Sequence, residues 1–115
     1  MTDVLYHITP RRHLPSIMVN GLIPGHRRGL TVASAKRQDK VYLTNNPDYI
    51  MKTQAGDEWL RRNDVVILAV DVSEIDIKPV EYRYGATYTI SDFEFTTDRV
   101  HPRHIALHEN KKDAI

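Results

Sequence analysis

The longest uninterrupted apolar stretch of the chain, VVILAV at residues 65–70, predicts a strand buried on both faces. The apolar residues continue without alternation until Asp71, whereas a strand with one solvated face would alternate. Shorter segments rich in β-branched and aromatic residues predict further strands, since such side chains fit a pleated, half-buried surface. These segments are 4–8, 41–44, 93–96 and 105–107.

Two short helices are predicted in the N-terminal half. Leu14, Ile17 and Met18 recur at the spacing of one helix face, and Asn20-Gly21 is typical of a helix end. The three residues 46–48, Asn-Pro-Asp, combine an N-cap, a proline at the first helical position and an early acid. They predict a second helix over residues 47–55.

The second predicted helix needs a buried side, and the sequence offers Tyr49 and Ile50 for it, with Met51 as a third candidate. Many short strands with two small helices indicate an α+β fold. We expect one domain over residues 1–115, with two packed β-sheets and the helices at their side. The length and a hydrophobic fraction of 41% suit one such core.

Composition excludes several kinds of chemistry. The chain has no cysteine, which rules out disulfides, thiolate zinc sites and cysteine nucleophiles. Charged residues make up 27% of the chain, but the formal net charge is only +1, so there is no global attraction to nucleic acid. The longest apolar run is too short to cross a bilayer. We therefore expect a soluble, cytoplasmic protein without a membrane partner.

Residues 25–40 are locally basic, with five basic residues against one acidic residue. Arg27 and Arg28 are suited to bidentate contacts with phosphate, so this stretch could bind the pyrophosphate of a dinucleotide or a nucleic-acid backbone. A solvated loop with no ligand explains the same composition equally well. The six histidines include no HExxH pattern, and no metal site is predicted.

Three residues on predicted strands are candidates for chemistry: His7, Tyr42 and Glu94. A neutral imidazole offers one hydrogen-bond donor and one acceptor, and a carboxylate can stabilise positive charge or accept a proton. Each residue also has an alternative role. His7 could be a structural hydrogen-bonding group, Tyr42 a core aromatic residue, and Glu94 a solvated acid on an alternating strand. Asp92 is the substitute acid if Glu94 is the wrong choice.

The motifs around these residues resemble the ADP-ribosyltransferase fold family, in its branch with a His, Tyr, Glu triad. YHIT, LPSI and NGLIP resemble the opening of the DNA-modifying ADP-ribosyltransferase toxins of toxin-antitoxin pairs. VYLT, VILAVDV and VHPRHI are also similar to RNA 2'-phosphotransferases and rifamycin-modifying transferases. The resemblance spans residues 4–107 and implies a core split between the two sheets, where these enzymes hold NAD.

The resemblance also implies a role for each candidate. Glu94 would stabilise the oxocarbenium-like cation that forms when the bond from ribose to nicotinamide breaks. His7 would bind the ribose hydroxyls, and Tyr42 would stack on the nicotinamide ring. Further contacts to NAD would come from Ile8, Thr9, Thr44, Arg27 and Arg28.

The expected activity is NAD-dependent mono-ADP-ribosyl transfer to a nucleic-acid base or another acceptor, with release of nicotinamide. An antitoxin protein is a further expected partner. Two alternatives stay open on the sequence alone. One is an NAD-dependent RNA 2'-phosphotransferase, and the other is a non-catalytic nucleotide-binding module of the same fold.

Overall fold

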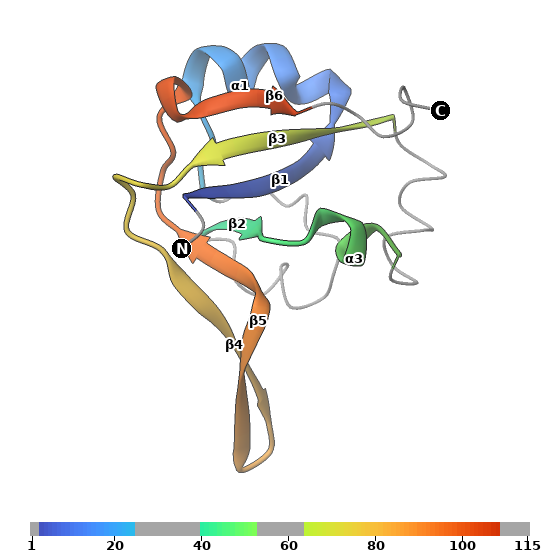
Figure 1. The fold of residues 1–115 in the computed structure, drawn as a ribbon, viewed down its shortest axis with the longest axis vertical. Helices are drawn as coiled ribbons and strands as arrows, with labels where there is room; N and C mark the ends of the chain where they lie inside the picture. Colours follow the sequence, from blue (N-terminus) through green and yellow to red (C-terminus); the bar gives the residue numbers. More distant parts are fainter. Residues whose placement is uncertain (1–2, 25–39, 53–63, 109–115) are drawn as a thin grey trace.

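The computed structural model describes residues 3–24, 40–52 and 64–108 (Figure 1). Six strands form one sheet in the order β4-β5-β2-β1-β3-β6, and every neighbouring pair is antiparallel. The strands are β1 (Val4–Pro10), β2 (Val41–Thr44), β3 (Val65–Asp71), β4 (Lys78–Tyr84), β5 (Thr87–Thr97) and β6 (Ile105–His108). The helices are α1 (Leu14–Asn20) and α3 (Pro47–Lys52), with short 3-10 turns at Arg11–His13 and Pro102–His104.

The α+β class is confirmed, but the prediction of two packed sheets is wrong for the described residues, whose six strands belong to one hydrogen-bonded sheet. The sheet is nevertheless nearly divided. β1 pairs with β3 along its whole length, whereas β1 and β2 pair at one position, between Tyr6 and Thr44. Two three-stranded halves, β4-β5-β2 and β1-β3-β6, therefore meet at a narrow junction.

The predicted central strand is confirmed as β3. Its residues Val65 to Leu68 and Val70 are all buried, and it lies between β1 and β6. One of its faces shares a hydrophobic cluster with Leu5 of β1 and with Ile17 of α1. That helix has the predicted bounds, but Met18 on it is 42% exposed, so its prediction as a core residue is wrong. Ile17 is the buried residue of this short helix, and Leu14 packs against the same cluster.

The residues that follow α1 pair with a segment near the C-terminal end of the described chain. Gly21 caps the helix with φ of 81° and ψ of −171°, and its amide donates to the carbonyl of Ile17. Leu22 then forms an isolated antiparallel bridge with Val100, with both N–H···O distances at 2.9 Å. Leu22 and Val100 are both buried in the core, so this bridge fixes the helix against the segment that precedes β6.

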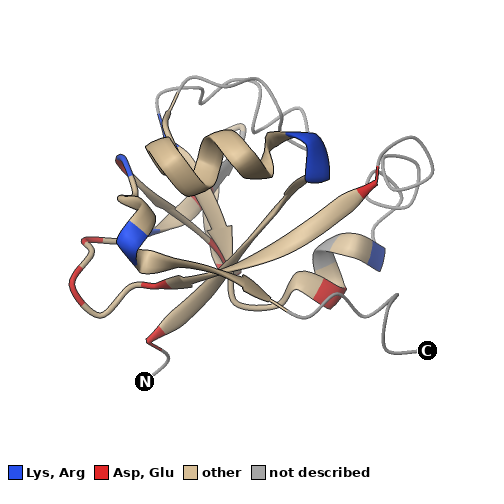
Figure 2. Cartoon of the chain, turned by 90° about the horizontal axis from the view of Figure 1, so that it is seen from above, with Lys and Arg blue, Asp and Glu red and all other residues tan. Residues whose placement is uncertain are grey.

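The second helix, α3, begins as the sequence predicts. The side chain of Asn46 accepts a hydrogen bond from the amide of Tyr49 at 3.1 Å, which caps the helix. An acid near its start, Asp48, and a base near its end, Lys52, complement the helix dipole (Figure 2). Tyr49 is 50% exposed, so its predicted burial is wrong. The predicted continuation over residues 53–55 lies outside the described residues.

The β4–β5 hairpin extends away from the rest of the sheet as an arm (Figure 1). Its turn contains Gly85 at φ of 64°, a left-handed conformation that suits glycine. The predicted strand at 93–96 is the inner part of β5, where it pairs with β2. Farther out on the same strand, Tyr88 and Ile90 are exposed. Across the described ranges, no helix has the length and apolar character that a membrane crossing requires.

Candidate functional site

His7 lies at the junction between the two half-sheets. Its ring atom Nδ1 is 2.8 Å from the backbone carbonyl oxygen of Tyr42. If the register set by Tyr6 and Thr44 continued, that carbonyl would lie opposite Ile8 and would take part in the backbone ladder. The imidazole thus bonds a β2 carbonyl at the point where regular pairing with β1 has stopped.

The protonation of His7 follows from this contact. A carbonyl oxygen can only accept, so Nδ1 carries the hydrogen and donates it. Burial lowers the pKa of His7 below the usual 6.5, although the hydrogen bond to Tyr42 acts in the opposite direction. The ring is therefore neutral near pH 7, which leaves Nε2 as a hydrogen-bond acceptor.

The lowered pKa of His7 predicts a pH dependence of stability. Below about pH 6.5 the unfolded chain binds a proton at this ring that the folded protein resists, so the unfolding free energy should fall as the pH falls. We expect urea unfolding between pH 7.5 and 5.5 to show this loss. In His7→Gln the amide can still donate to Tyr42 but cannot titrate, and the loss should shrink.

The pKa of Glu94 is shifted in the direction that gives the opposite pH dependence of stability, and Glu94 is present in both the wild type and His7→Gln. Its raised pKa favours the folded state as the pH falls, so it cannot produce the expected loss. An identical pH dependence of the unfolding free energy in wild type and His7→Gln would show that His7 is not the group responsible for the loss.

Glu94 lies on the inner part of β5. It pairs in register with Thr44 of β2, which in turn pairs with Tyr6 of β1. Paired residues of antiparallel strands place their side chains on the same face. Tyr42 pairs with Thr96 two positions along, so Tyr42 and Glu94 share that face.

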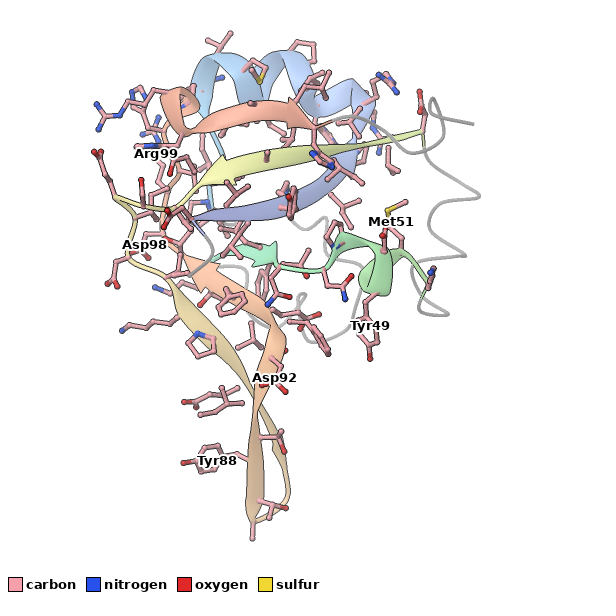
Figure 3. The ribbon with its side chains drawn as sticks, viewed as in Figure 1. Tyr49, Met51, Tyr88, Asp92, Asp98 and Arg99 are labelled. Carbon is pink, nitrogen blue, oxygen red and sulfur yellow. The ribbon has the colours of Figure 1, made fainter. Side chains whose placement is uncertain are left out.

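The carboxyl group of Glu94 is half-buried rather than directed to bulk water. Burial raises its pKa above the usual 4.5. The substitute acid, Asp92, is exposed (Figure 3). Of these two acids, Glu94 has the environment that suits a group active in chemistry, because desolvation strengthens its interaction with a developing positive charge.

His7 and Glu94 leave their strands on opposite faces. His7 alternates with Leu5 and Thr9 on the face of β1 that carries the core, whereas Glu94 belongs to the face of Tyr6. His7 is thus hydrogen-bonded to the backbone of Tyr42. Glu94 lies on β5, which pairs with β2, the strand that contains Tyr42. The two side chains therefore lie on opposite faces of the sheet, near the single pairing of Tyr6 and Thr44 that joins the half-sheets.

The other residues predicted to contact NAD differ in their burial and in their hydrogen bonds. The Thr44 hydroxyl donates to the carbonyl of Phe93 at 2.7 Å and accepts from the amide of Asn46 at 3.0 Å, so it serves the fold. Thr9 is buried, with 4% of its surface exposed, and Ile8 is half-buried. Arg27 and Arg28 lie outside the described residues.

Sequence reasoning assigned no role in the site to two residues that lie near Glu94. Ser91 accepts hydrogen bonds from the amides of Phe93 and Glu94, and Asn45 donates to the carbonyl of Asp92. Serine in a turn-like segment was a recognisable feature of the sequence, but its partners depend on how β2 meets β5.

A pocket of about 480 Å³ lies elsewhere, at the base of the hairpin arm. Lys40, Lys78, Glu81 and Asp98 are among its lining residues, and Lys40 pairs with Asp98 at 2.7 Å. It includes none of His7, Tyr42 and Glu94. Within the described part of the chain, no group of three or more His, Asp or Glu side chains is placed to hold a metal ion.

Comparison with protein families finds no family model that matches the chain. Comparison with curated proteins finds no match either.

Proposed function

We propose that the protein is an NAD-dependent mono-ADP-ribosyltransferase, which releases nicotinamide and transfers ADP-ribose to an acceptor. One observation carries the proposal: a neutral His7 bonded to Tyr42 stands at the break in a split sheet, with a half-buried Glu94 on the adjoining strand. The order of the YHIT, VYLT and FEF segments along the chain supports it.

Each residue has the role that the resemblance to ADP-ribosyltransferases implies for it. With Nδ1 held by the Tyr42 carbonyl, Nε2 of His7 would accept a hydrogen bond from a ribose hydroxyl. The Tyr42 ring would stack on the cationic nicotinamide ring. Neither role requires a charged histidine, in agreement with the lowered pKa of His7.

Glu94 would act on the ribose. When the bond from ribose C1' to the nicotinamide nitrogen breaks, the electron pair leaves with nicotinamide and the ribose becomes an oxocarbenium-like cation. A carboxylate beside it stabilises the positive charge, and it can accept the proton of the attacking acceptor. Partial burial makes both effects larger than they would be in water.

The test is NAD turnover by the purified full chain. We expect nicotinamide release, measured by chromatography, and label transfer from adenine-labelled NAD to single-stranded DNA or to protein acceptors. In Tyr42→Leu, NAD affinity should fall about tenfold through lost stacking, whereas Tyr42→Phe should keep most of it because the ring remains.

Three results would overturn the proposal, each in favour of a different function. Phosphate loss from RNA that carries a 2'-phosphate, without label transfer, would identify the phosphotransferase alternative. NAD binding without nicotinamide release would identify a binding module. Absence of both binding and turnover would remove NAD altogether.

A further inference from the structure

The strand that carries Glu94 contains a large bulge. On the hairpin, Glu81 faces Ile90 and Pro79 faces Phe95. Four residues of β5, 91–94, therefore stand opposite one residue of β4, Val80. A bulge of this kind bends its strand and changes the direction of the side chains that it carries.

The backbone of the bulge is held by side chains instead of by β4. The Ser91 hydroxyl oxygen accepts from the amides of Phe93 and Glu94, both at 3.1 Å. These amides belong to the segment in which the register with β4 shifts, so Ser91 replaces ladder acceptors.

On the opposite side, β2 and the residue after it hold the carbonyls of the bulge. The Asn45 side-chain nitrogen donates to the Asp92 carbonyl at 2.9 Å. The Phe93 carbonyl accepts from the Thr44 hydroxyl at 2.7 Å and from the Asn45 amide at 3.1 Å. The residues just before Glu94 are thus bonded through both their donors and their acceptors.

A ring contact adds a third restraint. The rings of Tyr49 on α3 and Phe93 on the bulge are stacked, with centroids 4.8 Å apart and an interplanar angle of 27°. Tyr49 projects from α3 on the side of Asp92, far from Tyr88 at the outer part of the arm (Figure 3). The start of α3 and the bulge therefore form one connected unit.

We propose that Ser91 and Asn45 are positioning residues, which fix the bulge of β5 so that Glu94 is held at the junction of the half-sheets. The inference deepens the proposed function and rests on it for its catalytic meaning. Neither residue needs to touch NAD. Each acts through the backbone on the N-terminal side of the Glu94 Cα.

The first test measures Glu94 itself, by carboxyl ¹³C NMR titration of the full chain. In Ser91→Ala the two amides lose their acceptor, the bulge loosens, and the carboxyl group gains solvent. Its raised pKa should then fall toward the usual value. Ser91→Thr retains a hydroxyl group and should keep the pKa near that of the wild type. Asn45→Ala, at an exposed position, should lower the pKa of Glu94 in the same direction.

The second test separates positioning from general stability. In an NAD turnover assay, Ser91→Ala should lower kcat about 10- to 100-fold and change KM for NAD by less than about twofold, since a misplaced group affects the reacting centre most. Ser91→Thr should restore kcat. An equal loss in both Ser91 variants would contradict a role for the hydroxyl.

The two proposals fail separately. If the wild type releases no nicotinamide, the proposed function is wrong, and the titration still decides whether Ser91 holds Glu94. If the Glu94 pKa is the same in wild type, Ser91→Ala and Asn45→Ala, the positioning inference is wrong, whatever the turnover assay shows.

Discussion

Replacement of Glu94 by glutamine should lower kcat for ADP-ribosyl transfer by about 10²- to 10⁴-fold, the range for loss of a positioned acid-base group. Glutamine has nearly the same shape but cannot carry the negative charge that the oxocarbenium-like state needs. Binding of NAD should change little, because the charge matters most in the transition state. Nicotinamide release measured over a range of NAD concentrations would separate the two effects.

The same substitution should not destabilise the fold. Burial disfavours the charged form of Glu94, as its raised pKa indicates, so a neutral side chain removes an unfavourable interaction at pH 7. Asp92→Asn is the matched control, since it removes an exposed acid two residues away. A variant Glu94→Gln with wild-type kcat, or a larger loss in Asp92→Asn, would assign the chemistry to another group.

Replacement of Gly21 by alanine should lower the unfolding free energy by about 2–4 kcal/mol. At φ of 81° and ψ of −171° the backbone occupies a region that is essentially restricted to glycine. A Cβ atom built there would lie 2.0 Å from the carbonyl oxygen of Val100, an impossible approach. That oxygen accepts the amide of Leu22, so relief of the clash would also break the bridge.

Gly85→Ala is the matched control for this prediction. It also has positive φ, at 64°, but no atom lies within 4 Å of the added Cβ. Only backbone strain remains, and the expected loss is about 1–2 kcal/mol. Urea unfolding of both variants would measure the difference. Equal losses of unfolding free energy in the two variants would mean that the close approach of the Val100 carbonyl to Gly21 does not add to the destabilisation.

Much of the secondary structure could be predicted from the sequence. The apolar run of β3, the strand at Val41–Thr44, the bounds of α1 and the Asn46 cap all follow from local patterns, and each is confirmed. The errors concern the neighbours of each element. Met18 and Tyr49 have the right spacing for a buried face, but neither helix meets enough core to cover them.

Sheet arrangement and site geometry were harder to predict, for a physical reason. One pairing between Tyr6 and Thr44 decides whether the strands form one sheet or two, and no local preference encodes it. The alternation of Phe93, Glu94 and Phe95 is visible in the sequence. The bulge beside it is not, because it depends on the register between β4 and β5. The role of the triad stays a prediction.

The strand order has a consequence for how the chain acquires its structure. β1 is translated first, but its long ladder is formed with β3, which comes much later in the chain. β2 likewise has most of its pairing with β5, near the end of the described residues. Among the six described strands, only the β4–β5 hairpin is an extensive ladder between successive strands. A nascent chain leaving the ribosome would therefore expose unpaired β1 and β2 until most of residues 3–108 had been translated. Closing such distant contacts carries an entropic cost that slows folding and leaves time for aggregation.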